Sequence, residues 1–130
     1  MMLSGERASG YVLVVDDEED IRLLLGQLLR MEGYEVVTAE SGSSALACLR
    51  ASQQAVRLIL LDLMMPGMNG WQFRAEQLRD PSLADIPVVV MTGAGAKVEN
   101  MAALGSCEVL LKPVNLDTLF DSIKRYCPLD

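Results

Sequence analysis

The chain has 130 residues, of which 51 % are hydrophobic, and it carries a formal net charge of −7. This length suits one domain with its own core, and the negative charge disfavours direct binding to nucleic acid. No apolar run approaches the ~20 residues that a membrane-spanning helix needs. The absence of histidine from the sequence excludes imidazole base catalysis and zinc sites built on histidine.

The cysteines indicate the compartment of the protein, and the terminal residues indicate the bounds of the domain. The three cysteines, Cys48, Cys107 and Cys127, are odd in number and widely separated. This pattern favours free thiols in a reducing cytoplasm. Residues 1–10 have no apolar signal core and are expected to be a disordered lead-in. We therefore expect one domain over residues 11–127, followed by a short tail at 128–130.

Apolar runs of strand length alternate along the chain with stretches of helical periodicity. In chain order the expected elements are the strand Tyr11–Val15, the helix Asp20–Met31, the strand Tyr34–Ala39, the helix Ser41–Ala51, the strand Leu58–Leu61, the helix Asn69–Arg79, the strand Val88–Met91, the short helix Val98–Leu104, the strand Cys107–Leu111 and the helix Asn115–Tyr126. Gly33 is the expected stop of the first helix, and Ser41 and Asn115 are expected helix caps.

This alternation predicts an α/β domain, in which a parallel sheet carries helices on both faces. The strands are apolar on both of their faces, as strands covered on both sides should be. The pattern does not determine the order of the strands in the sheet.

Polar residues follow four of the five expected strands. The first strand ends at Asp16 and Asp17, the third at Asp62, the fourth at Thr92 and the fifth at Lys112. In an open parallel sheet, ligands bind beyond the carboxyl ends of the strands. We therefore expect three carboxylates, one hydroxyl and one ammonium to meet at one edge of the sheet.

Such a cluster has a restricted chemistry. Three neighbouring carboxylates repel one another and need a cation at neutral pH, and carboxylates with a backbone carbonyl and water suit Mg²⁺. A carboxylate can also act as a nucleophile and form an acyl phosphate, whose phosphoryl oxygens a metal, an ammonium and a hydroxyl would stabilise. The sequence has no glycine-rich loop of the kind that holds ATP, so the phosphoryl group is expected to come from another molecule.

The ordered set formed by Asp16-Asp17, the run from Asp62 to Gly70, Thr92 and Lys112-Pro113 resembles the receiver domain of bacterial two-component response regulators. The resemblance covers residues 11–126. It implies a flavodoxin-like (βα)5 three-layer sandwich with a parallel sheet in the order 2-1-3-4-5. It also implies a cytoplasmic signalling module without enzymatic turnover.

The resemblance further implies a role for each site residue. Asp62 would accept a phosphoryl group from a histidine kinase or a histidine phosphotransfer protein. Asp16 and Asp17 would hold Mg²⁺ together with Asp62 and the Met64 carbonyl, and Thr92 and Lys112 would contact the phosphoryl oxygens. The Lys112-Pro113 bond would be cis. A downstream protein or output domain would bind the face formed by the fourth helix, the fifth strand and the fifth helix.

The chain departs from the family pattern at two places. Val109 stands where many receivers carry an aromatic residue that follows the threonine inward, so we expect the signal to pass through the Gly93–Ala96 loop and the helix after it. Met64 and Ala94 offer no carboxylate or amide that could orient a water molecule, so we expect slow self-dephosphorylation.

Two other functions stay open on the sequence alone. A degenerate receiver that only binds a partner is one, because Val109 removes the usual aromatic reporter. A phosphatase of the haloacid dehalogenase type is the other, although that family needs an acid where this chain has Met64 and a cap domain for which the length leaves no room. Glu18 is expected to interact with the helix dipole, and Trp71 and the methionines Met64, Met65 and Met68 are expected to pack.

Overall fold

The computed structural model describes residues 10–51, 55–93, 104–105 and 107–128. Its elements, in chain order, are β1 Gly10–Val15, α1 Glu19–Met31, β2 Val36–Ala39, α2 Gly42–Ala51, β3 Ala55–Asp62, α3 Gly70–Arg79, β4 Val88–Thr92, β5 Glu108–Leu111 and α5 Leu116–Tyr126. The short helix expected at Val98–Leu104 falls, apart from Leu104, outside the described residues, as do Ala94 and most of the Gly93–Ala96 loop.

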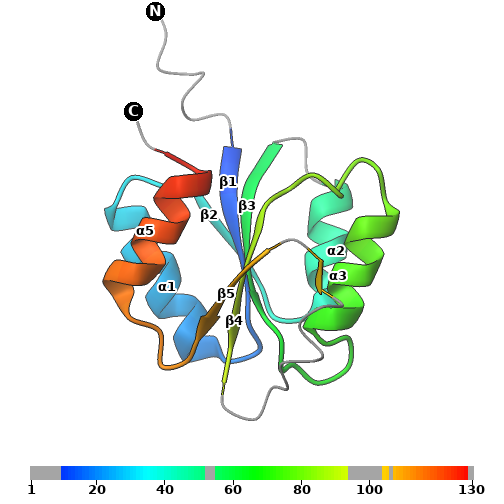
Figure 1. Cartoon of the computed structure of the whole chain (residues 1–130), viewed down its shortest axis with the longest axis horizontal. Coiled ribbons are helices and arrows are strands. Elements are labelled where there is room, and N and C mark those ends of the chain that lie inside the picture. Colours follow the sequence, from blue (N-terminus) through cyan, green and yellow to red (C-terminus); the bar gives the residue numbers. More distant parts are fainter. Residues whose placement is uncertain (1–9, 52–54, 94–103, 106, 129–130) are drawn as a thin grey trace, which may run out of the picture.

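The five strands form one parallel sheet in the order β2-β1-β3-β4-β5 (Figure 1). Helices α1 and α5 lie on one face of the sheet, and α2 and α3 lie on the other. This arrangement confirms the expected three-layer α/β sandwich and its strand order. None of the helices in the described part of the chain has the length and apolar character needed to span a bilayer.

Alternate residues of each central strand enter two separate cores. Leu13 and Ile59 pack on the side of α2 and α3 with Phe73, whereas Val12 and Leu60 pack on the side of α1 and α5. Every residue of β1 and β4 is buried, but the two edge strands, β2 and β5, are only partly covered. Burial on both faces explains why the central strands have continuous apolar runs instead of an alternating pattern.

Local side-chain and backbone bonds set the helix ends. The expected stop at Gly33 is confirmed, since Gly33 has a φ of 105° and its N–H donates to the Arg30 carbonyl. The Ser41 hydroxyl accepts from the Ser44 N–H at 3.1 Å, and the Asn115 side chain accepts from the Thr118 N–H at 3.0 Å. Both residues therefore cap the helices that follow them.

Three strands match their predicted ranges to within one residue, and two, β2 and β3, differ by more. Strand β2 begins at Val36 rather than Tyr34, because the Tyr34 N–H is taken by the Leu29 carbonyl at the end of α1. Strand β3 begins at Ala55 rather than Leu58. Arg57 interrupts the apolar run on which the prediction rested, yet the backbone on either side of it pairs with β1. Backbone pairing with β1 extends the strand past Arg57, and Val56 also packs against the core on the side of α2 and α3.

Candidate functional site

The carboxyl ends of four strands bring the predicted polar residues to one edge of the sheet. Asp62 ends β3 and is paired with Met91, so Thr92 lies one residue further along the neighbouring strand. Thr92 in turn is paired with Leu111, and its carbonyl accepts a hydrogen bond of 2.8 Å from the Lys112 N–H. The peptide bond from Lys112 to Pro113 is cis, as the family resemblance implies.

Three carboxylates gather at this edge. Asp16, Asp17 and Asp62 each offer a carboxylate oxygen, and these oxygens lie within 4.8 Å of one another. The Asp16 side chain is fully buried and Asp62 is 3 % exposed, whereas Asp17 faces solvent. This set of hard oxygen donors suits Mg²⁺, which prefers carboxylates and keeps several water ligands.

The hydrogen bonds of Asp16 leave one of its oxygens for such a cation. Oδ1 accepts from the Glu18 N–H at 2.9 Å, and the Asp16 N–H donates to the Ala39 carbonyl at 3.1 Å. Oδ2 is buried and has no hydrogen-bond partner among the described residues. A buried carboxylate oxygen without a hydrogen bond is costly. The Lys112 ammonium, 3.6 Å from Oδ2, offsets part of that cost, and a bound cation would offset more.

The Asp62 carboxylate is held from two sides. Its Oδ1 accepts a hydrogen bond of 3.1 Å from the Met64 N–H, and its Oδ2 lies 3.4 Å from Nζ of Lys112. Burial raises the pKa of the Asp62 carboxyl, and the negative charge of Asp16 adds to this effect. The Met64 N–H and the Lys112 ammonium act in the opposite direction but do not cancel it.

Lys112 forms ion pairs with more than one carboxylate. Its Nζ lies 3.6 Å from Oδ2 of Asp16 and 4.0 Å from Oε1 of Glu18, besides its contact with Asp62. Burial alone would lower the pKa of Lys112, but the carboxylates of Asp16 and Asp62 outweigh burial and raise it. The Lys112 side chain is therefore a cation at neutral pH, and it lies next to the carboxylates of Asp16 and Asp62.

The fourth strand contributes a hydroxyl to the same edge. Thr92 is fully buried, and its Oγ1 has no hydrogen-bond partner in the described part of the chain. A buried hydroxyl without a partner is an unused donor. It is available to an oxygen of a group that enters the site.

The loop between β3 and α3 is fixed by close backbone packing. The Gly70 N–H donates to the Leu63 carbonyl at 3.0 Å, and a Cβ on Gly70 would lie 2.7 Å from Leu63 Cα. Met68 of this loop packs against Gly42 at the start of α2, where an added Cβ would lie 2.8 Å from Cγ of Met68. Two glycines thus let this loop approach β3 and α2 closely enough to hold Asp62 in place.

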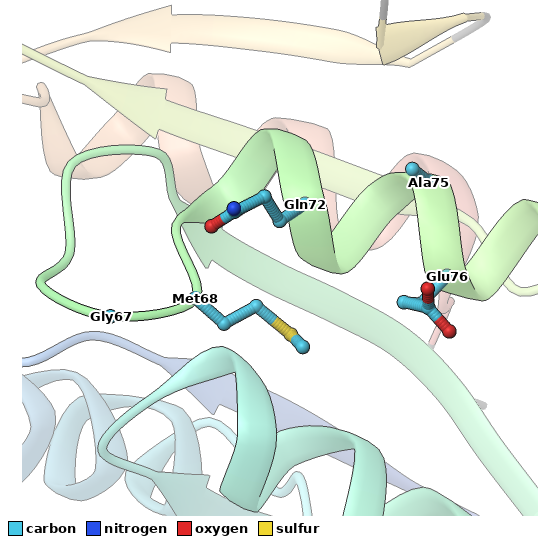
Figure 2. A pocket seen from close by; sticks show the side chains of 5 residues that line it. All are labelled: Gly67, Met68, Gln72, Ala75 and Glu76. Carbon is cyan, nitrogen blue, oxygen red and sulfur yellow. The ribbon is translucent and has the colours of Figure 1, made fainter.

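Figure 2 shows that the side chains of Met68, Gln72 and Glu76 lie on one side of the loop and α3. They border an open hollow of about 390 Å³ together with Gly67 and Ala75. None of the three clustered carboxylates lines this hollow. Gln72 is occupied there as a structural residue, because it completes a capping box with Asn69 at the start of α3.

Two residues of this region escaped prediction from the sequence. The sequence predicts only a helix-dipole role for Glu18, which stands at the N-cap of α1 with its carboxylate 4.0 Å from Nζ of Lys112. The sequence patterns predict no role at the site for Arg22, whose guanidinium donates to the Asp16 carbonyl at 2.8 Å. A basic residue in the first turns of a helix that follows an acidic pair is the signal that could have identified it. Among the methionines, Met65 is buried and Met68 packs against the core, but Met64 is 59 % exposed.

The cysteines and Trp71 behave as the sequence indicates. Cys48, Cys107 and Cys127 are free thiols, and burial raises the pKa of Cys107 and Cys127. Trp71 packs against the core on the side of α2 and α3.

Comparison with known proteins gives a consistent result. The family model of the response regulator receiver domain matches residues 12–124. Sporulation initiation phosphotransferase F of Bacillus subtilis is 34 % identical over 122 residues, which cover 91 % of this chain and 94 % of that protein. The transcriptional regulatory protein GlrR of Escherichia coli is 40 % identical over 116 residues, or 87 % of this chain and 25 % of GlrR. The chain thus spans nearly all of the first relative and about a quarter of the second.

Solved structures lead to the same group of proteins. A response regulator receiver protein from Pseudomonas putida superposes with a TM-score of 0.84 at 28 % identity, covering 91 % of this chain and 98 % of that one. The chemotaxis protein CheY4 from Vibrio cholerae superposes with a TM-score of 0.78 at 31 % identity, covering 92 % and 99 % of the two chains.

Proposed function

Because the chain belongs to the response regulator receiver domain family, we propose that Asp62 is its phosphoacceptor and that Mg²⁺ is needed for the transfer. The domain is a signalling module of two-component systems. The observation that carries the finer proposal is the meeting of Asp16, Asp17 and Asp62 within 4.8 Å, beside the Lys112 ammonium. A cluster of this kind is costly without a cation and suits phosphoryl transfer with one.

The proposed metal ligands are the carboxylates of Asp16, Asp17 and Asp62 and the carbonyl of Met64. Oδ2 of Asp16, which accepts no hydrogen bond from the described residues, supports this assignment. When bound, Mg²⁺ would offset negative charge on the oxygens of the transferring group.

The chain's own residues would then perform the transfer. A carboxylate oxygen of Asp62 attacks the phosphorus of a phosphohistidine on the partner; the new P–O bond forms as the P–N bond breaks, and the imidazole nitrogen keeps the electron pair. Lys112, 3.4 Å from Asp62, is placed to hold one phosphoryl oxygen. The Thr92 hydroxyl, which has no hydrogen-bond partner among the described residues, can donate to another. Together they stabilise charge that develops on that group.

Residues 1–130 contain no histidine, so the phosphohistidine of the proposed donor lies outside this sequence. A small apolar hollow of about 210 Å³ lies beside Lys112, and a donor could cover it during transfer; it is lined by Ile21, Leu24, Leu25, Met91, Pro113, Val114, Leu116 and Leu119. Leu24 and Leu116 are both exposed there. We therefore place the docking of a histidine kinase or histidine phosphotransfer protein between α1 and the start of α5.

A separate surface is proposed for the downstream partner. We propose that a downstream protein or output domain binds the face that includes β5 and α5, where Leu111 is 70 % exposed. Val109 is partly buried and packs against the core on the side of α2 and α3. Because it is a valine, it has no ring that could move into the site.

The two alternatives receive less support. A degenerate receiver would not need a complete acidic cluster with its lysine, and here all of these groups meet. A phosphatase of the haloacid dehalogenase type needs an acid two residues after the nucleophile, a position held by the exposed Met64.

Phosphoryl acceptance can be tested directly with small donors. The protein is incubated with acetyl phosphate or beryllofluoride, with and without Mg²⁺, and intact mass and amide spectra are recorded. We expect an adduct that depends on Mg²⁺ and is lost in Asp62→Asn. A wild-type protein that forms no adduct under these conditions would support the degenerate reading instead.

A further inference from the structure

We propose that Arg22 is a positioning residue for the metal site, which it organises by holding the backbone of Asp16. Its Nη1 donates a hydrogen bond of 2.8 Å to the Asp16 carbonyl oxygen. Hydrogen bonds from a charged donor are shorter and stronger than neutral ones. The inference rests on the proposed Mg²⁺ binding and adds a residue to it that does not touch the metal.

Arg22 completes a set of three fixed points on Asp16. The Asp16 N–H donates to the Ala39 carbonyl at 3.1 Å, its Oδ1 accepts from the Glu18 N–H at 2.9 Å, and its carbonyl accepts from Arg22. Only Oδ2 of this buried residue is left without a hydrogen bond among the described residues. The three bonds therefore fix the residue and leave only Oδ2, which lies 3.6 Å from Nζ of Lys112, open to a further ligand.

The geometry of α1 explains how a residue six positions away reaches this carbonyl. The Arg22 N–H donates to the Glu18 carbonyl at 3.1 Å, which places Arg22 in the first turns of the helix. Long helical side chains point back toward the N-terminus of their helix. The guanidinium therefore lies over the Asp16–Glu18 turn, and partial burial limits its competition with water.

Charge and position make opposite predictions for Arg22. As a cation near the acidic cluster, it repels Mg²⁺, so charge alone predicts tighter metal binding after its removal. As an anchor of Asp16, it lowers the cost of ordering the ligands, so position predicts weaker binding after its removal. The direction of the change in affinity therefore decides between the two.

The experiment measures Mg²⁺ affinity by isothermal titration calorimetry in wild type, Arg22→Met, Arg22→Lys and Arg30→Met. Arg30 is the matched control, since it lies on the same helix and also donates to a backbone carbonyl, that of Val36 at 3.1 Å, in an exposed position. We expect about tenfold weaker binding in Arg22→Met, a typical effect of losing a residue that orients metal ligands. Arg22→Lys should recover part of the loss, and Arg30→Met should stay within about twofold of wild type.

A second measurement needs no metal. Amide hydrogen exchange at Glu18, whose N–H is bonded to Asp16 Oδ1, should be faster in metal-free Arg22→Met than in wild type and unchanged in Arg30→Met. Unchanged or tighter Mg²⁺ binding in Arg22→Met overturns the proposal, as does unchanged exchange at Glu18. A wild type that binds no Mg²⁺ contradicts the proposed function itself, and the exchange measurement then still decides whether Arg22 positions Asp16.

Discussion

Replacing Gly70 with alanine should damage both the fold and the phosphoacceptor. A Cβ at this position would lie 2.6 Å from Leu63 Cδ2, 2.7 Å from Leu63 Cα and 3.0 Å from the Asp62 carbonyl oxygen. The Leu63 side chain can rotate away, but the other two atoms are backbone. Restoring a normal carbon contact of about 3.5 Å to Leu63 Cα requires a shift of about 0.8 Å.

The expected cost follows from that displacement. Inserting a methyl group into a well-packed site costs about 1–3 kcal/mol, and backbone contacts place Gly70→Ala at about 2–3 kcal/mol. For a domain of this size, the melting temperature should fall by roughly 6–12 °C. Because the moving segment carries Asp62, the rate of phosphorylation by acetyl phosphate should also fall about tenfold or more, since small misplacements of reacting groups have large effects.

Gly26→Ala is the matched control. Gly26 lies inside α1, where its added Cβ would meet only the end of the flexible Arg30 side chain, at 3.3 Å, and Thr38 at 4.0 Å. Alanine is favoured over glycine in a helix by roughly 0.5–1 kcal/mol, so this variant should be as stable as wild type or more stable. Thermal unfolding and acetyl phosphate kinetics measure both variants. A Gly70→Ala protein that matches wild type in both would refute the reasoning.

Three other changes test the electrostatics and the polar packing. In the metal-free protein the raised pKa of Asp62 means that its carboxyl stabilises the fold below its unfolded pKa and loses this contribution as pH rises through the folded pKa. Urea unfolding should therefore show that Asp62→Asn is stabilised relative to wild type more strongly near neutral pH than at pH about 3. An equal stabilisation at both pH values would contradict the raised pKa of Asp62. Arg74→Met should cost about 2–4 kcal/mol in the same assay, because Arg74 is 4 % exposed and donates to the Leu104 carbonyl and the Gln77 side chain. A cost within about 0.5 kcal/mol would instead be that of a surface residue. Met64→Glu should shorten the phosphoryl lifetime about tenfold by orienting a water molecule, measured as phosphate release, whereas loss within seconds in wild type would show that no such group is needed.

Much of the architecture could be predicted because local patterns carry it. Apolar runs and helical periodicity located the five strands and the four helices that the structure describes. Since parallel strands place their carboxyl ends at one edge, knowing which residues end the strands was enough to bring Asp16, Asp62, Thr92 and Lys112 together. The residue types alone, without any interatomic distance, then predicted a site for a metal and a phosphoryl group.

The sequence by itself determined which groups occupy the site, because residue type and strand position are both readable along the chain. Only the tertiary structure decided how each group is held. The extension of β3 through Arg57, the approach of Gly70 to Leu63 and the reach of Arg22 to the Asp16 carbonyl all depend on contacts made by backbone groups. Backbone groups are the same in every residue, so no pattern of side chains records which of them will meet.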